Sequence, residues 1–245
     1  MTTASPAIRH SRGNKLDTAK PNPLVELGIT LIIPALILMK LSGPEDLGAA
    51  KALILALSFP LAWGLRDYWK RRKFNLFAVL GVVSTVLTGG IGLLALDTQW
   101  LAVKEAAVPG LIGLAVLGST YTRYPLVKTI LLNPAMIDTA RLQEKLAAHG
   151  AIQVFETHLL RATWMLSGTF FFSSAMNYFL ATYLVVSPAG TPAFNEELGQ
   201  LTLLSYPFIA LPSMAMMIFV IYYLSRTTQK LTGLSFTDFL NSAKD

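Results

Sequence analysis

The sequence predicts an all-α membrane protein, a bundle of about six transmembrane helices with a short amphipathic helix between the fourth and the fifth. The first observation is composition: 53% of the 245 residues are apolar, 14% are charged and the mean hydropathy is +0.52. These values lie outside the usual range of soluble domains. The second is that the apolar residues form helix-length runs separated by short polar turns. The third is that lysine and arginine concentrate in alternate loops.

A polar, basic segment precedes the first apolar run. Residues 1–23 carry one acid, Asp17, against Arg9, Arg12, Lys15 and Lys20, which predicts a flexible cytoplasmic tail. A basic segment before an apolar run also resembles a signal peptide. Run 24–41 is long, however, and no small-x-small site follows before the next polar turn, which favours an uncleaved first helix.

The first two predicted helices span residues 24–41 and 50–69. They contain Pro34 and Pro60, which membrane helices tolerate. The second helix ends in a basic cluster with two aromatic residues, Arg66-Asp67-Tyr68-Trp69-Lys70-Arg71-Arg72-Lys73. Because aromatic residues favour the membrane interface and basic residues favour short cytoplasmic loops, this cluster is the strongest topological signal in the chain.

Residues 76–96 and 101–120 are predicted to form a helical hairpin. The turn between them is too short to hold a domain, so the two helices should be antiparallel neighbours. Both runs are rich in small residues that let helix backbones approach closely: Gly89, Gly90, Gly92, Gly110, Gly113 and Gly118. We expect these helices to be close-packed partners, and leucine at Gly90 or Gly113 to overpack their interface.

A short amphipathic helix is predicted over residues 135–149, where Ile137, Leu142 and Leu146 alternate with charged residues. Two placements are open for it: on the cytoplasmic membrane interface, or covering the bundle. Two further membrane helices follow at 159–186 and 201–224, and residues 226–245 form a polar tail. The distribution of basic residues among the loops predicts that both termini are cytoplasmic.

Motifs for catalysis or cofactor binding are not found. The chain has no cysteine, which excludes disulfides and thiol chemistry, and it shows no phosphate-binding loop, metal-spaced histidine pair or nucleophile elbow. The run Gly89-Gly90-Ile91-Gly92 lacks the strand and acid of a dinucleotide site. His10, His149 and His158 are expected to be solvated. The net charge of +6 comes from basic residues beside apolar runs, which favours membrane lipids over nucleic acid as partners.

Four polar residues inside the predicted spans are candidates for a functional or structural role: Glu26, Lys104, Glu105 and Asn177. Lys104 and Glu105 are adjacent and project about 100° apart, so they are predicted not to share a helix face. We expect Lys104 to reach the interface and Glu105 to need a partner within the bundle. A structural role is favoured, and a functional pathway is the alternative. Three hydroxyls near Asn177 either bond neighbouring helices or line a polar cavity: Ser167, Ser173 and Ser174.

The order of several features resembles the intracellular septation protein A family of bacterial inner-membrane proteins, particularly its longer members of unassigned function. The residues that carry the resemblance are Gly89-Gly90, Asp97, Trp100, Lys104, Gly118-Ser119, Pro125-Leu126 and the run from Leu160 to Asn177. The chain departs from the family in its N-terminal tail and in residues 133–158. It also departs after Lys104, because the family's lysine is usually followed directly by proline, whereas here the next proline is Pro109. The resemblance implies a non-enzymatic inner-membrane protein of envelope maintenance or division. Its partners would be envelope or division proteins, or further copies of the chain.

A small secondary transporter is the competing hypothesis. Transporters also combine helix-breaking prolines with intramembrane Glu and Lys. The predicted helices of this chain contain five such prolines: Pro34, Pro60, Pro109, Pro207 and Pro212. A cavity with converging polar side chains would favour transport, whereas a dry, fully packed bundle would favour the envelope role.

Overall fold

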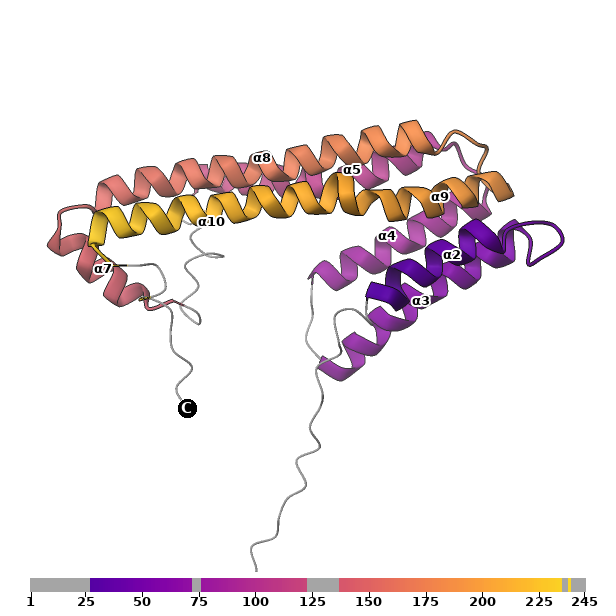
Figure 1. The fold of residues 1–245 in the computed structure, drawn as a ribbon, viewed down its shortest axis with the longest axis horizontal. Helices are drawn as coiled ribbons and strands as arrows, with labels where there is room; N and C mark the ends of the chain where they lie inside the picture. Colours follow the sequence, from indigo (N-terminus) through magenta and orange to yellow (C-terminus); the bar gives the residue numbers. More distant parts are fainter. Residues whose placement is uncertain (1–26, 72–75, 123–136, 235–237, 239–245) are drawn as a thin grey trace, which may run out of the picture.

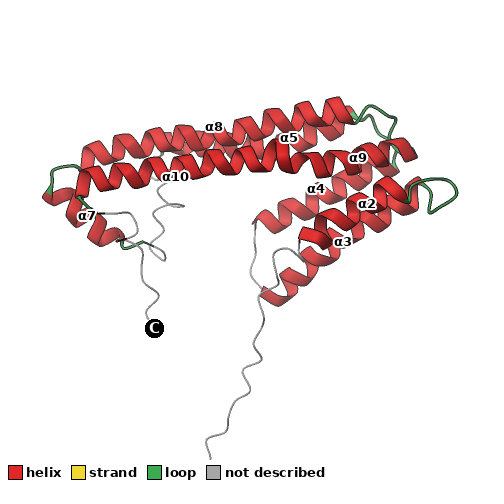
Figure 2. Cartoon of the chain, viewed as in Figure 1, coloured by secondary structure: helices red, strands yellow, loops and turns green. Residues whose placement is uncertain are grey.

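The computed structural model describes residues 27–71, 76–122, 137–234 and 238. Over these residues the protein is all-helical (Figure 2). The elements along the chain are η1 (Gly28–Ile32), α2 (Ile33–Lys40), α3 (Ala49–Arg71), α4 (Leu76–Leu93), α5 (Gln99–Gly118), η2 (Ser119–Tyr121), α7 (Thr139–Ala148), α8 (Ile152–Leu184), α9 (Pro192–Ser205), η3 (Tyr206–Ala210) and α10 (Leu211–Thr232). Segments η1 and η3 are π-helical, and η2 is a 3₁₀ turn.

The helices form two groups that diverge from one end of the molecule (Figure 1). One group contains α5, α8 and α10, and the other contains α2, α3 and α4. Helix α9 packs on α2 and continues through η3 into α10, which packs on α8. A single helical rod therefore joins the two groups.

The end from which the groups diverge is also where three turns gather: 41–48, 94–98 and 185–191 (Figure 1). None of the three contains lysine or arginine. The opposite end of the first group carries α7, which contacts α8 and α10. The two ends of the first group therefore differ in architecture.

Within the described ranges, three helical stretches are long and apolar enough to cross a membrane: Ala49–Arg66, Gln99–Tyr121 and Pro192–Thr232. Two shorter apolar stretches are Gly28–Lys40 and Val79–Leu93. Helix α8 is less apolar because it carries hydroxyl and amide residues, although at 33 residues it is about 50 Å long. That length exceeds the hydrocarbon thickness of about 30 Å.

The last helix begins earlier than the sequence indicated, at Pro192 rather than near residue 201. Thr191 caps it, because the Thr191 hydroxyl accepts a hydrogen bond from the Phe194 amide at 3.2 Å, and proline occupies the first helical position. Glu197 accepts hydrogen bonds from the amides of Val186 and Ser187 at 3.0 and 2.9 Å, which holds the preceding turn. Residues 192–200, which lie between the last two predicted membrane helices, are therefore helical. Likewise α8 begins at residue 152, not 159.

Apolar side chains are buried in two clusters. At the end with the three turns, Leu53, Leu101 and Phe194 join α3, α5 and α9. At the other end, Leu142 and Leu146 of α7 are buried with side chains of α5, α8 and α10. The apolar side chains of this short helix therefore pack against the bundle.

The predicted close packing of the α4–α5 hairpin through its glycines is wrong. A methyl group added at Gly89 would lie 3.0 Å from Leu57 of α3, and one at Gly113 would lie 3.2 Å from Phe170 of α8. A methyl group at Gly90 or Gly118 would meet nothing within 4 Å. The small face of α4 thus packs on α3 and that of α5 on α8, and a methyl group at Gly90 has no close neighbour on α5.

Candidate functional site

A cleft of about 370 Å³ lies between α4, α5 and α8, along the divergence of the two helix groups. Its volume falls within the range of small-molecule sites, about 300–1,000 Å³. The lining combines charged, hydroxyl, amide and apolar side chains: Leu80, Gly81, Ser84, Lys104, Glu105, Val108, Pro109, Ile112, Phe170, Ser173 and Asn177. The cleft therefore collects three of the four polar residues that the sequence singled out.

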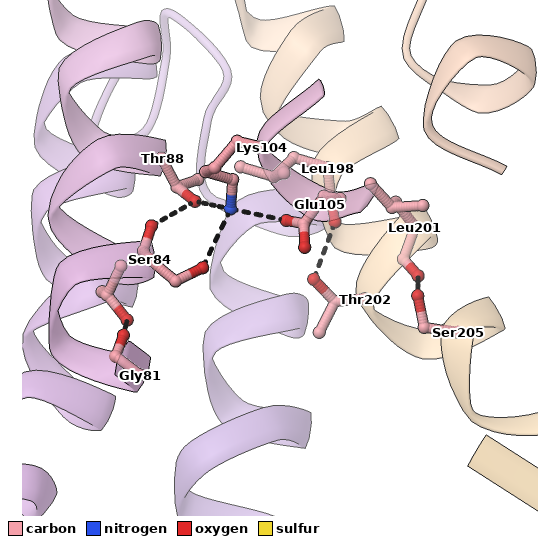
Figure 3. A network of polar contacts seen from close by, with 10 residues as sticks. Gly81, Ser84, Thr88, Lys104, Glu105, Leu198, Leu201, Thr202 and Ser205 are labelled. Carbon is pink, nitrogen blue, oxygen red and sulfur yellow. Dashed lines mark hydrogen bonds and ion pairs between the residues drawn. The ribbon is translucent and has the colours of Figure 1, made fainter. Parts of the chain in front are cut away.

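Lys104 joins α5 to α4 (Figure 3). Its ammonium group donates hydrogen bonds to the hydroxyls of Ser84 at 3.2 Å and Thr88 at 2.8 Å, and to Glu105 Oε1 at 2.7 Å. Thr88 in turn donates to the Ser84 carbonyl at 3.0 Å. The Lys104 side chain is only 8% exposed. Because an ammonium group has three N–H donors, all of them are used here.

One sequence prediction about this pair is wrong. Adjacent residues of a helix project about 100° apart, and across that angle Lys104 and Glu105 form an ion pair at 2.7 Å. Lys104 was expected to reach the interface, whereas the Ser84 and Thr88 hydroxyls of α4 hold it inside the bundle. The expectation that Glu105 needs a bundle partner is confirmed, and that partner is Lys104.

The polar residues of α8 divide between the two roles that the sequence left open. Ser167 donates to the Gly113 carbonyl at 2.9 Å and Ser174 to the Ala106 carbonyl at 2.7 Å, so both bond α8 to α5. Ser173 and Asn177 line the cleft. The Asn177 amide nitrogen donates to the Ser173 carbonyl at 2.8 Å and to its hydroxyl at 3.4 Å.

The remaining candidates lie elsewhere. Glu26 and His10 are outside the described residues. His158 is not simply solvated as predicted, because it is half-buried and its Nδ1 lies 2.5 Å from the Tyr223 hydroxyl of α10. His149 is exposed on the end of α7. Within the part of the chain that the structure describes, no group of three or more His, Asp or Glu residues is placed to hold a metal ion.

Sequence reasoning missed Ser84 and Thr88. They stand four residues apart on α4, so they share one helix face, and this spacing within an apolar run was a usable signal. It pointed to a polar stripe on α4 without indicating which helix faced it. No family model, curated protein or solved structure matches the chain, and its function therefore has to follow from the chemistry of the cleft.

Proposed function

We propose that this chain is a small membrane transporter that binds a polar solute in the α4–α5–α8 cleft. The observation that carries the proposal is the convergence of Lys104, Glu105 and Asn177 on one cleft in an otherwise apolar bundle. Ionisable groups inside a membrane protein are expensive, and they mark pathways for substrates and ions. A cleft with converging polar side chains supports transport over a dry, fully packed bundle.

The proposed membrane arrangement has six crossings: η1–α2, α3, α4, α5, α8 and α9–α10. The three turns without lysine or arginine would face the outside of a bacterial inner membrane, and both termini would be cytoplasmic. In support, these turns lie together at one end of the molecule. With α8 and the α9–α10 rod longer than the hydrocarbon region, α7 would cover their cytoplasmic ends.

The rod through η3 supplies a hinge for this function. Pro207 lies in η3 and Pro212 just after it, and π-helical turns and prolines both interrupt the regular hydrogen bonding of a helix. Since α9 packs on one helix group and α10 on the other, bending at η3 would change the angle between the groups. The cleft between α4 and α5 would then open or close.

A role in envelope maintenance or division, as the septation protein A resemblance implies, is the second candidate. The feature that favours it is α7, whose outer surface presents Arg141, Gln143 and Glu144 at one end of the bundle. An exposed polar helix held rigidly by Leu142 and Leu146 suits binding to an envelope protein or to another copy of the chain. This role does not require a water-filled cleft.

Single-cysteine labelling tests the transport proposal directly, because the chain has no cysteine of its own. Ser173→Cys places a thiol in the cleft, and Ser167→Cys is the matched control on the same helix, at a position that is 1% exposed. We expect a membrane-impermeant maleimide to label Ser173→Cys in both inverted and right-side-out vesicles, and to leave Ser167→Cys unlabelled. Absence of labelling at both positions would mean a dry cleft and would favour the envelope role.

A further inference from the structure

We propose that the cleft selects an organic cation, an amine with an apolar body, and that Glu105 is the counter-ion of its ammonium group. This inference rests on the proposed function, and it assigns the charge of the solute. The charges alone do not decide whether the cleft binds a cation or an anion, since Lys104 and Glu105 have opposite charges. The hydrogen bonds of the two residues remove that ambiguity.

Lys104 has no donor left for an anionic ligand. Its three N–H groups are used by Ser84, Thr88 and Glu105, all within 3.2 Å. At 8% exposure the side chain also offers little surface to a solute. To bind a carboxylate or phosphate, the ammonium group would have to give up bonds that hold α5 to α4. Lys104 is therefore a positioning residue that fixes the Glu105 carboxylate.

Glu105, in contrast, has an oxygen available. Its Oε1 accepts from Lys104, and among the residues that the structure describes none donates to Oε2. The side chain is 29% exposed and lines the cleft. A carboxylate can accept several hydrogen bonds, and charge-assisted bonds from ammonium groups are among the strongest in proteins.

Asn177 of α8 adds a second acceptor to the lining of the cleft. Its amide nitrogen already donates to Ser173, and within the described ranges its Oδ1 accepts no hydrogen bond. The unused polar atoms of these two residues are therefore both acceptors. An ammonium group, which only donates, complements them.

The rest of the lining determines the body of the solute. Most of the other side chains are apolar: Leu80, Val108, Pro109, Ile112 and Phe170. A hard metal cation would need about six oxygen ligands, which this lining does not provide. A protonated amine with an aromatic or aliphatic body uses both the acceptors and the apolar walls.

Three probes with the same phenylethyl body and different charge test the inference on the full-length protein in mild detergent. They are 2-phenylethylammonium, 3-phenylpropionate and the neutral 2-phenylethanol, measured by titration calorimetry and by melting temperature at neutral pH. We expect the ammonium probe to bind and raise the melting temperature, and the other two to bind at least about tenfold more weakly, as loss of a charge-assisted hydrogen bond implies. Equal or tighter binding of the carboxylate, or no binding of the amine, would overturn the inference.

Single substitutions test whether the amine binds at Glu105 and Asn177. Glu105→Gln and Asn177→Leu should each weaken amine binding, Glu105→Gln by about tenfold or more. Glu196→Gln, on the exposed surface of α9, is the matched control and should bind like the parent. Retention of full affinity in Glu105→Gln would contradict the assignment. If Glu105→Gln fails to fold, the selectivity of the parent among the three probes still decides the charge.

The labelling and binding experiments distinguish a failure of the transport proposal from a failure of the charge assignment. If Ser173→Cys is labelled but the amine does not bind, the cleft is accessible and only the charge assignment is wrong. If Ser173→Cys stays unlabelled, the transport proposal itself fails.

Discussion

At the scale of single residues, the pair Lys104–Glu105 shows how an apolar bundle accommodates two opposite charges. Removing two ions from water costs several kcal/mol each, and their mutual attraction offsets this only when further hydrogen bonds complete the site. Ser84 and Thr88 supply those bonds from α4. The lysine side chain is consequently buried at 8% exposure, while the carboxylate is 29% exposed and lines the cleft.

Removing the lysine alone should therefore be worse than removing both charges. Lys104→Met leaves the Glu105 carboxylate without its partner, and we expect the free energy of unfolding to fall by about 1–3 kcal/mol. The double variant Lys104→Met/Glu105→Gln should recover part of this loss, because no unpaired charge remains. Melting curves in detergent measure both. A double variant no more stable than Lys104→Met would show that the pair contributes little.

Sequence reasoning located Lys104, Glu105 and Asn177 but did not find how they interact. Their residue types stand out within apolar runs, so a scan of the chain detects them. Their roles depend on α4 hydroxyls distant in sequence, and only the fold brings these within hydrogen-bond reach of Lys104. The geometry of α5 alone therefore did not predict that the adjacent charges of Lys104 and Glu105 form an ion pair.

At the scale of elements, hydropathy predicted where helices exist but not which faces meet. All of the predicted apolar runs contain helix in the structure, apart from residues outside the described ranges. The hairpin glycines were assigned to the wrong interface because their spacing is equally suited to α3 and α8 as neighbours. Helix ends outside the apolar runs were also missed, since residues 152–158 and 192–200 carry too many polar side chains to look like membrane helix.

The contact between α9 and α2 depends on Gly199. A methyl group there would lie 2.8 Å from the Ala35 carbonyl oxygen and 2.6 Å from Met39 Cγ. Gly199→Ala should therefore push α9 away from α2 and lower the free energy of unfolding by about 1–3 kcal/mol.

Gly168→Ala is the matched control for this contact. It lies on the exposed side of α8, and an added methyl group would meet nothing within 4 Å. Because alanine is the better helix former, this change should be neutral or stabilising by up to about 1 kcal/mol. Melting curves of the two variants compare them, and equal stabilisation by both would mean that α9 and α2 are not in close contact.

At the scale of the whole molecule, the two helix groups are held together mainly at one end (Figure 1). The cluster around Leu53, Leu101 and Phe194 joins them there, and the α9–η3–α10 rod crosses between them. Hydropathy predicts the helices of both groups but carries no information about the angle between them. The shape of the cleft was for that reason outside what the sequence alone could predict, although four of its polar lining residues had been singled out: Lys104, Glu105, Ser173 and Asn177.

The proposed number of crossings leads to a last prediction, which depends on α8. Among the residues that the structure describes, three helical stretches are both long and apolar enough to span a membrane by themselves, and α8 is not one of them. If α8 crosses, the turns before and after it lie on opposite sides; if it does not, they lie on the same side. Gly150 and Gly190 are exposed glycines in these two turns, each with a positive φ, so a short tag can be inserted beside either without interrupting a helix.

We expect a tag inserted beside Gly150 to be protected in right-side-out vesicles and a tag beside Gly190 to be accessible from outside. A tag after Asp245 is the control and should behave like the one at Gly150, because the α9–α10 rod crosses once more. Tags at Gly150 and Gly190 on the same side would remove α8 from the membrane. Ser173 and Asn177 would then line an interfacial groove, and a solute path through the cleft would no longer be tenable.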